Sequence, residues 1–393
     1  MAVGGPVRAL ALNAGSSTLK AALYEVEPDA ALAAPADVVW QGQVGWDPGD
    51  GRAAAREMLQ TLPLDSPSDI AVVGHRIVHG GERFHQPTRL TDEVRSAVRA
   101  MTASAPLHNA AGLEGIAAAE ALFGDAAEQV AVFDTAFHAG LTPAAYAYAG
   151  PHEWLARGLR RYGFHGINHE YAAHRAAWLL GRPLDELRLI TCHLGSGCSL
   201  AAIRDGHSVD TTMGFTPLEG VVMGTRSGTL DPGLILHLLR EEGASVDGLD
   251  QVLNHGSGLR GLSGRSGDLR EVLAARDGGD ERARLAFDVY VHRLRSHLGA
   301  MLGSLGGLDA VVFTAGVGEH AAEVREEALR PFGCLGLQLD DDANAGAQPD
   351  CDVSADGSAV HVMVIRAHEE WAIARAAVQL VTEAVPALSA AAR

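Results

Sequence analysis

Two segments of the chain carry the same short motif, and its residue types suit the binding of a phosphate. The motif reads NAGSSTLK at residues 13–20 and HLGSGCSL at residues 193–200, and a hydrophobic run precedes each copy. Glycines let the backbone N–H groups of such a turn approach an anion, and serine hydroxyls add further donors. The repeat predicts a duplicated fold in which two such turns bind phosphate from both sides.

Two arginines stand in glycine-rich loops that could receive an anion. Arg76 lies in GHRIVHGGE (residues 74–82), directly after a hydrophobic run, and Arg226 lies in MGTRSG (residues 223–228), shortly before a predicted helix. A guanidinium group binds a carboxylate or phosphate with two parallel hydrogen bonds. The alternative for each arginine is a solvated side chain on a surface loop. The glycines, histidines and hydroxyl groups beside the two arginines make this alternative the less favoured one.

An acidic residue and several histidines extend this set of polar groups. Asp134 follows a hydrophobic run, so it would lie at the ligand-facing edge of an open α/β sheet, although it could also cap the next helix. His108 could donate to an anion or simply start a helix. His165 and His169 have a spacing that would suit zinc, but no complete ligand set accompanies them. A donor role for His165 is therefore favoured.

Two further loops, at residues 261–270 and 313–320, combine glycines with charged side chains. The second contains GxG after a hydrophobic run, which alone is a weak signal for nucleotide binding. The sequence contains neither a Walker motif nor the protein-kinase motifs. Any nucleotide must therefore be held in another way.

Composition narrows the classes of function. The 393 residues, 47% of them hydrophobic, predict two or three domains with sizeable cores. The net charge of −18 argues against a nucleic-acid partner. The four cysteines form no CxxC pair, which argues against a disulfide or zinc framework. Because the sequence has neither a signal peptide nor a membrane-spanning run, we expect a cytoplasmic protein without a membrane partner.

Hydrophobic runs alternate with alanine-rich stretches, which predicts an α/β architecture. The predicted strands are residues 8–12, 70–74, 130–133, 187–192, 310–314 and 360–365. The predicted helices are residues 92–101, 109–122, 169–180, 232–242, 280–305 and 369–380. Because the motif restarts midway, we expect one domain at residues 1–150 plus 370–393, with the C-terminal helix packing back on it, and another at residues 151–369.

Ten segments resemble the acetate kinase family, in order and over nearly the whole chain. They are LNAGSSTLK, GHRIVHGGE, APLHN, VFDTAFH, RRYGFHG, CHLGSGCSL, MGFTPLEGVVMGTRSG, GLSGRSGDLRE, FTAGVGEH and HEEWAIAR. The resemblance implies the acetate and sugar kinase/Hsp70/actin fold: two duplicated ribonuclease-H-like α/β domains with an active-site cleft between them. It also implies a homodimer, with the acyl substrate on the N-terminal domain and both the nucleotide and the dimer contact on the C-terminal domain.

The resemblance also implies a role for each matching residue. The catalytic residues would be Asp134, His165 and Arg226, and Mg²⁺, or Mn²⁺ in its place, would bind Asn13 and Glu369. The acyl substrate would contact Arg76, Val78, Leu107, His108, Phe164 and Pro217. ATP or ADP would contact Lys20, His193, Leu194, Gly195, Ser196, Gly197, Asp268, Leu269, Arg270, Gly316, Val317, Gly318, Glu319 and His320. The chain has Ser196, His320 and His368 where the family usually has asparagine, which bears on the adenosine contact and the metal shell.

The implied reaction is acetate + ATP ⇌ acetyl phosphate + ADP. Acetate is already ionised at neutral pH, so we expect Asp134 to organise an arginine or the metal shell rather than to remove a proton. Two alternatives stay open. A propionate or other short-chain acyl kinase would differ in the methyl pocket, where Val78 favours acetate modestly. An ATP-gated binding protein of the Hsp70 or actin kind would share the turns but would not need Arg76, His165 and Arg226.

Overall fold

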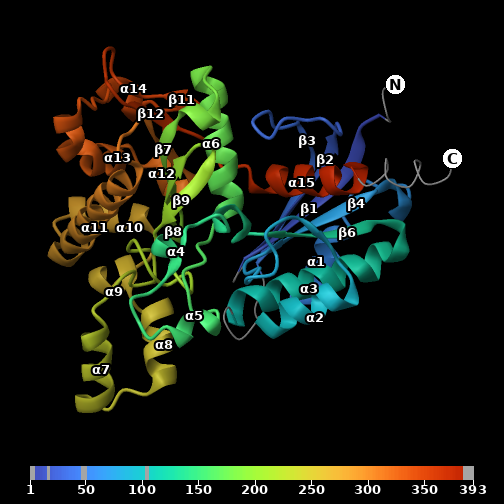
Figure 1. Cartoon of the computed structure of the whole chain (residues 1–393), viewed down its shortest axis with the longest axis horizontal. Coiled ribbons are helices and arrows are strands. Elements are labelled where there is room, and N and C mark those ends of the chain that lie inside the picture. Colours follow the sequence, from blue (N-terminus) through green and yellow to red (C-terminus); the bar gives the residue numbers. More distant parts are fainter. Residues whose placement is uncertain (1–4, 16–17, 46–50, 102–105, 384–393) are drawn as a thin grey trace. The chain divides into compact units, whose positions relative to one another are not determined.

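The computed structural model describes residues 5–15, 18–45, 51–101 and 106–383. The chain divides into two compact units (Figure 1). The first unit comprises Met1–Ala139, Phe164–Tyr171 and His368–Arg393, and the second comprises Gly140–Gly163 and Ala172–Ala367. Each unit contains a six-stranded mixed sheet covered by helices.

The sheet of the first unit begins with an antiparallel meander and continues with parallel strands. Across the sheet the strands are β3 (Val38–Gly45), β2 (Thr18–Val26), β1 (Val7–Ala14), β4 (Val72–Ile77), β6 (Glu128–Phe133) and β5 (Thr88–Arg89). β1 pairs antiparallel with β2 and parallel with β4, and β4 pairs parallel with β6. The carboxyl ends of β1, β4 and β6 therefore meet at one edge, where polar residues following these strands come together.

Helices cover both faces of this sheet. They are α1 (Gly51–Leu59), α2 (Asp92–Ala100), α3 (Pro106–Phe123) and α15 (Glu369–Glu383). Leu10 and Leu12 of β1 share one hydrophobic core with residues of α1 and α3, whereas a Cβ on Gly74 of β4 would lie 2.7 Å from Ile373 of α15. Because side chains alternate between the faces of a strand, β4 keeps a glycine where α15 crosses it closely. Figure 1 shows α15 and α3 on opposite faces of the sheet.

The sheet of the second unit repeats this topology. Across it the strands are β11 (Cys351–Asp352), β12 (His361–Val364), β10 (Ala310–Thr314), β7 (Arg188–Leu194), β8 (Cys198–Arg204) and β9 (His207–Thr211). β7 pairs antiparallel with β8 and parallel with β10, and β10 pairs parallel with β12. β7, β10 and β12 thus occupy the places that β1, β4 and β6 occupy in the first sheet. The predicted duplication is confirmed.

The second unit holds most of the helices. They are α4 (Pro143–Tyr146), α5 (Glu153–Ala156), most of α6 (Gly166–Leu180), α7 (Pro232–Glu241), α8 (Val246–His255), α9 (Gly258–Ser263), α10 (Leu269–Asp277), α11 (Glu281–Leu305), α12 (Ala315–His320), α13 (Ala322–Leu329) and α14 (Asp341–Ala345). α11 packs against β7, β8 and β9 and contacts α9, α10 and α13. Within the ranges given above, no helix combines the length and apolar character needed to cross a membrane.

Every predicted strand and helix is present, with ends that shift by a few residues. The largest shifts are of three residues: β4 ends at Ile77 rather than residue 74, and α15 ends at Glu383 rather than residue 380. Two helices begin three residues early, α3 at Pro106 rather than residue 109 and α6 at Gly166 rather than residue 169. A proline suits the first turn of a helix, since its missing N–H has no helical partner there. The early start of α6 follows a left-handed residue, His165, with φ 57°, a conformation that hydrophobic periodicity does not predict.

Candidate active site

An ion pair lies at the carboxyl edge of the first sheet. Arg76, near the end of β4, donates from Nε and Nη2 to Oδ2 of Asp134, at 3.0 and 2.5 Å. Asp134 follows β6 directly, and the two side chains are only 13% and 2% exposed. The parallel pairing of β4 with β6 brings together two residues that are 58 positions apart.

Burial and mutual attraction act in opposite directions on this pair. Burial raises the pKa of the Asp134 carboxyl, and Arg76 and the backbone N–H of His165 oppose that rise. Burial alone would lower the pKa of Arg76, but Asp134 and Glu369 raise it above its ordinary value. Arg76 therefore carries a fixed positive charge, and the pair holds its guanidinium in one orientation.

A second cluster joins the end of β1 to the start of α15. Asn13 donates from Nδ2 to Oε2 of Glu369 at 2.7 Å and to Oε1 of Glu370 at 2.9 Å. The Oδ1 atom of Asn13 lies 3.3 Å from Nη1 of Arg76, so the two clusters are continuous. Lys20 of β2 is the register partner of Asn13, which places both side chains on one face of the hairpin. The contact of Glu370 with Asn13 was not predicted, although its place beside Glu369 was a signal.

This cluster fits a magnesium ion that is held mainly by phosphates. Among the described residues, no group of three or more His, Cys, Asp or Glu side chains is arranged to hold a metal alone. Mg²⁺ commonly uses one or two carboxylates, with waters and substrate phosphates completing its shell. The Glu369 carboxylate, positioned by the Asn13 amide, meets that requirement.

The loop after β4 leads to a buried apolar region. Val78 is 3% and Phe164 is 1% exposed, and the ring centroid of His79 lies 5.6 Å from that of Phe164. Asn109 of α3 accepts from the His79 N–H at 3.1 Å, and Thr135 accepts from the Gly80 N–H at 3.0 Å. These contacts fix the loop that carries Val78, and they were not predicted from the sequence. Leu107 and His108 lie in the first turn of α3, but their side chains are outside the described part of the structure. Ser16, in the motif at residues 13–20, is also outside it.

His165 is held next to Asp134 by backbone contacts. The N–H of Gly166 donates to the Asp134 carbonyl at 2.8 Å, and the N–H of His165 bonds the Asp134 carboxylate. A Cβ on Gly166 would lie 2.2 Å from the Asp134 carbonyl oxygen, so only glycine allows this approach. The first unit thus gathers Asn13, Arg76, Asp134, His165 and Glu369.

In the second unit, the repeated turn after β7 packs against two other loops. The N–H of Gly195 bonds the Gly197 carbonyl at 3.0 Å, and the N–H of Gly224 bonds the Ser196 carbonyl at 3.2 Å. A Cβ on Gly224 would lie 2.8 Å from the Gly267 carbonyl oxygen. His193 and Leu194 are buried in β7, whereas Ser196 is exposed at the tip of the turn. The turn, the loop of Arg226 and the segment before α10 therefore pack closely against one another through glycines.

Asp268 caps the N-terminus of α10. Its Oδ1 accepts from the N–H of Arg270 at 2.9 Å, and the Arg270 guanidinium returns to Asp268 while remaining 89% exposed. Leu269 is buried between them along the chain. The Arg270 guanidinium is thus exposed but paired with Asp268, next to a helix N-terminus, where negative charge is favoured.

The segment after β10 rests on a buried arginine. Ala315 opens α12 in the left-handed region, with φ 66°, and Gly316 and His320 are exposed while Gly318 and Glu319 are buried. Arg325, only 1% exposed, donates to the carbonyls of Gly318 and Glu319 at 2.8 and 3.0 Å. Burial lowers the pKa of this guanidinium. Arg325 therefore fixes the backbone of the GVGEH segment from below, and Val317 lies within that segment.

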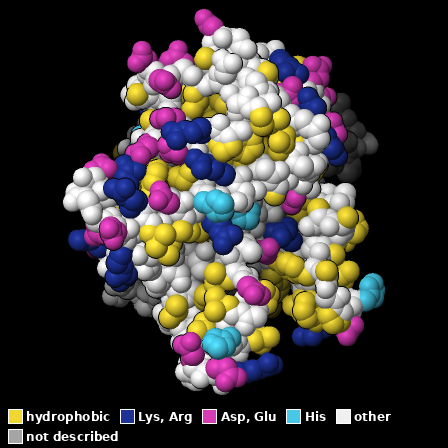
Figure 2. Space-filling model, turned by 90° about the vertical axis from the view of Figure 1, so that its left-hand side faces the viewer, with side chains coloured by type: hydrophobic (Ala, Val, Ile, Leu, Met, Phe, Trp, Pro, Cys, Tyr) yellow, Lys and Arg dark blue, Asp and Glu magenta, His cyan; other side chains and the backbone are white. Residues whose placement is uncertain are grey.

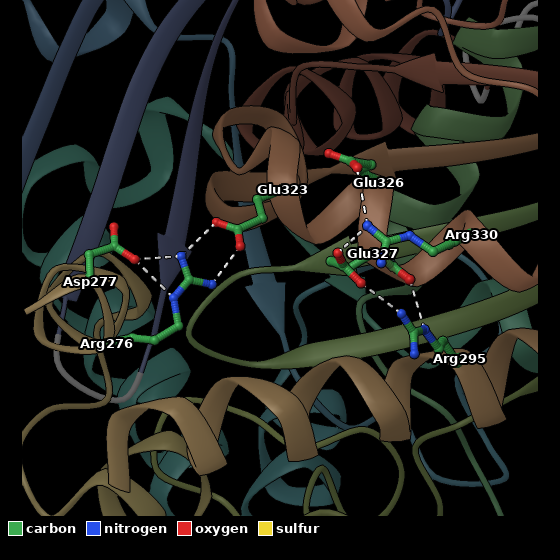
Figure 3. Close-up of polar contacts among 7 residues, drawn as sticks. All are labelled: Arg276, Asp277, Arg295, Glu323, Glu326, Glu327 and Arg330. Atoms are coloured by element: carbon green, nitrogen blue, oxygen red, sulfur yellow. Dashed lines mark hydrogen bonds and ion pairs between the residues drawn. The ribbon is translucent and has the colours of Figure 1, made fainter. Parts of the chain in front are cut away.

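Ion pairs connect the helices that follow these two segments (Figure 3). Arg276, near the end of α10, bonds Glu323 in the first turn of α13 through two contacts of 2.5 and 3.0 Å. It also pairs with Asp277, and its guanidinium lies 4.7 Å from the ring centroid of Phe287 on α11. Arg276 thus joins the helices that begin at Asp268–Arg270 and just after Gly316–His320.

Arg226 lies in a loop closed by glycines. Its Nη1 is 3.4 Å from the Pro217 carbonyl oxygen and 3.9 Å from the Met223 sulfur. Gly220 and Gly228 at the two ends of the loop have φ values of 110° and 69°, which other residues rarely adopt. The loop therefore presents a half-buried guanidinium beside Pro217.

Comparisons with known proteins identify the family of the chain. The model of the acetokinase family matches residues 8–375. An acetate kinase of Gloeobacter violaceus is 51% identical over 397 aligned residues, covering 94% of this chain and 98% of the relative. An acetate kinase of Nostoc sp. is 50% identical with the same coverage.

Solved structures are similar over the same length. The crystal structure of Porphyromonas gingivalis acetate kinase has a TM-score of 0.86 at 36% identity and covers 95% of this chain and 100% of that one. A propionate kinase of Francisella tularensis has a TM-score of 0.84 at 35% identity and covers 94% and 98%. These similarities confirm the predicted duplicated α/β fold of the sugar kinase/actin type. With a family model that spans nearly its whole length and relatives at half identity, the chain belongs to the acetokinase family.

Proposed function

We propose that this chain acts as an acetate kinase, which transfers a phosphoryl group reversibly between ATP and acetate to give acetyl phosphate and ADP. It is a phosphotransferase with a carboxyl group as acceptor. The observation that carries the proposal is the buried Arg76–Asp134 pair, continuous with Asn13 and Glu369. The Arg76 guanidinium supplies a fixed positive charge for the carboxylate of a small substrate. The Glu369 carboxylate beside it suits a metal ion that is bound to phosphates.

On the acyl side, Arg76 would bind the acetate carboxylate. Val78 and Phe164 would surround the methyl group, together with Leu107, His108 and Pro217. Because Asp134 and Asn13 already orient the Arg76 guanidinium, it needs little rearrangement when an anion arrives. Val78 would limit the size of the acyl chain, a preference of about 1–3 kcal/mol per methylene.

On the nucleotide side, the turn at His193–Gly197, the capped start of α10 at Asp268–Arg270 and the segment Gly316–His320 would hold ATP or ADP. Backbone N–H groups of such turns suit phosphates. Lys20, exposed on β2, would reach the phosphates as a point charge. The second unit would thus be the nucleotide domain and the first the acyl domain.

Mg²⁺, or Mn²⁺ in its place, would be held by Glu369 and Asn13. The ion would neutralise charge on the nucleotide phosphates. The other work falls to the chain's own side chains. Acetate is ionised at neutral pH, so no base is required. Asp134 would orient Arg76, while His165 and Arg226 would stabilise charge on the transferred group during direct in-line transfer.

The role of Asp134 is open to a direct test. Asp134→Asn should lower the rate because Arg76 loses its charged partner, but the residual rate should keep the pH dependence of the unaltered protein. Steady-state rates from pH 5.5 to 9 would check this. The loss of one ionisation from the profile, or a new one, would show that Asp134 transfers a proton.

We also propose that the chain works as a cytoplasmic homodimer through α7 and α8. No residue of α7 is buried. The exposed apolar side chains of α7 and α8 include Leu234, Leu236, Val246 and Val252, with exposed fractions of 43%, 47%, 73% and 53%. Hydrophobic side chains are visible near the lower end of Figure 2, the end at which α7 and α8 lie in Figure 1. Because a solvated helix rarely exposes this much apolar surface, a second copy is the proposed occupant. Light scattering after size exclusion should give twice the mass of one chain for the unaltered protein. The double variant Leu234→Asp, Leu236→Asp should give the mass of one chain.

The activity itself is tested by trapping acyl phosphate with hydroxylamine. Acetate, propionate and butyrate are each supplied with Mg-ATP, and hydroxamate is measured. We expect the highest kcat/KM with acetate. A higher value with propionate would assign the chain to propionate instead, and no hydroxamate from any of the three would end the kinase proposal.

A further inference from the structure

Three side chains of the second unit form a network that no role above uses. Arg161 donates from Nη1 to the carbonyls of Thr211, Thr212 and Met213 at 3.0, 3.0 and 2.9 Å. Its Nη2 pairs with Oε1 of Glu219 at 2.7 Å. One guanidinium thus caps the end of β9 and binds the loop that follows it.

The second oxygen of the Glu219 carboxylate is also occupied. The Tyr148 hydroxyl donates to Oε2 of Glu219 at 2.5 Å and accepts from the N–H of Phe215 at 2.9 Å. Burial, and then Glu219, raise the pKa of this hydroxyl, so it stays a donor at neutral pH. A carboxylate that accepts from both an arginine and a tyrosine has little freedom to rotate.

The loop is packed closely around this network. A Cβ on Gly214 would lie 1.7 Å from Oε2 of Glu219 and 2.2 Å from the Tyr148 hydroxyl. The Gly214 carbonyl also accepts from the N–H groups of Tyr162 and Gly163, at 3.0 and 3.3 Å. The segment that ends just before Phe164 is therefore tied to the start of the loop.

Pro217 lies between the fixed points of this loop. Gly214 and Phe215 are held on one side and Glu219 on the other, and the next residue, Gly220, bonds Thr229 through its N–H and its carbonyl at 3.1 and 2.9 Å. The Pro217 carbonyl oxygen in turn lies 3.4 Å from the guanidinium of Arg226. The position of Pro217 and one contact of Arg226 thus depend on Glu219 and its two donors.

We propose that Tyr148, Arg161 and Glu219 are positioning residues for phosphoryl transfer, because they hold Pro217 and, through its carbonyl, the Arg226 guanidinium. This inference rests on the roles proposed above for Pro217 and Arg226. Misplacement of a reacting or charge-stabilising group by about 1 Å can cost roughly 100-fold in rate. A network that only stabilised the fold would instead alter melting temperature without selecting between substrates.

The test compares Tyr148→Phe and Glu219→Gln with a matched control. The control is Glu327→Gln, which removes the charge of the Arg295–Glu327 pair between α11 and α13 (Figure 3). That pair spans 2.9 Å with side chains 30% and 23% exposed, against 2.7 Å with 17% and 31% for Arg161–Glu219. kcat, the KM for acetate and the KM for ATP are measured for each variant.

We expect Tyr148→Phe and Glu219→Gln to lower kcat/KM for acetate by about 10- to 100-fold, with the KM for ATP within about twofold of the unaltered value. The control should change neither quantity. Wild-type kcat/KM for acetate in both network variants would overturn the proposal, and so would a rise in the KM for ATP as large as the loss in kcat/KM for acetate. If Glu219→Gln fails to fold, Tyr148→Phe, which removes a single oxygen, carries the test alone.

A double-mutant cycle separates this proposal from the role of Arg226. If the network acts through Arg226, Glu219→Gln should cost little further rate in an Arg226→Ala background, because coupled residues are not additive. Additive losses would overturn the positioning role while leaving Arg226 in place. Near-normal turnover of Arg226→Ala itself would instead remove Arg226 from its proposed role, and the positioning proposal with it.

Discussion

The two sheets share a topology but end in different chemistry. In the first unit, β4 and β6 end in a buried ion pair, Arg76–Asp134, and β1 ends in Asn13, which bonds two glutamates. In the second unit, β7 and β10 end in glycine-containing segments whose backbone groups are held by other backbone groups and by Arg325. The same scaffold thus ends in a fixed side-chain cation in one unit and in glycine-containing backbone turns in the other.

The difference suits the ligands proposed for each unit. A small carboxylate offers two oxygens and little area, so a single oriented guanidinium provides most of its recognition. Nucleotide phosphates offer many oxygens, which several N–H groups can share. The comparison predicts that changes at Arg76 affect acetate and that changes at the glycine-containing segments of the second unit affect ATP.

The largest effect is expected from Arg76→Ala. It removes the fixed cation of the first unit, so kcat/KM for acetate should fall by about 10²–10³, or roughly 3–4 kcal/mol. The KM for ATP should change by less than about twofold, because the nucleotide segments lie in the second unit. Steady-state kinetics in both substrates would check this. Comparable damage to the KM for ATP would break the comparison.

A smaller effect is expected in the acid stability of the first sheet. Burial lowers the pKa of His75 to about 4, where its Nε2 lies 2.6 Å from Gln129. Because the folded pKa is below the unfolded value near 6.5, the neutral form stabilises the fold fully above pH 6.5, and this is lost as pH falls toward 4. The loss should reach about 2 kcal/mol at pH 5.

This loss can be located by hydrogen exchange. Between pH 7 and 5, after correction for intrinsic rates, β4 should lose protection more than β10. The pH dependence of unfolding should become shallower in His75→Gln. An unchanged slope in that variant would show that His75 does not titrate between the folded and unfolded states as expected.

The smallest effect is expected from Arg276→Met. It breaks the contact between α10 and α13, which positions two nucleotide segments, so the KM for ATP should rise roughly 3- to 10-fold, as for loss of a partly buried ion pair. Acetate kinetics at saturating ATP should stay the same. Arg330→Met, which breaks an exposed pair with Glu326, is the matched control. A similar rise in that variant would mean that the effect is not specific to the α10–α13 contact.

Local patterns were sufficient for much of the fold. The hydrophobic runs that predicted β4, β6, β7, β10 and β12 are buried strands at the expected places, since burial on both faces selects continuous apolar residues. The repeated turn also indicated that the two halves share a topology. The family motifs identified the polar loops, and the structure gathers five of their residues in the first unit.

Long-range contacts were not predictable in the same way. Glu370, Asn109 and Thr135 stand within the family motifs, but the motifs do not show which groups their side chains contact. The network of Tyr148, Arg161 and Glu219 joins three separate segments, one of them an irregular loop. Such contacts depend on where loops meet in space, and a single sequence does not record that.

By itself, the sequence determined the strands, the helices, the duplicated turns and the kind of polar side chain that each loop carries, because these depend on residue type and short-range periodicity. Only the tertiary structure decided which of those side chains meet. Asn13 reaches Glu369 across 356 positions, and Arg76 reaches Asp134 across 58. The physical reason is that parallel strand order and the packing of α15 on β1 and β4, rather than any local preference, bring these charges to one edge.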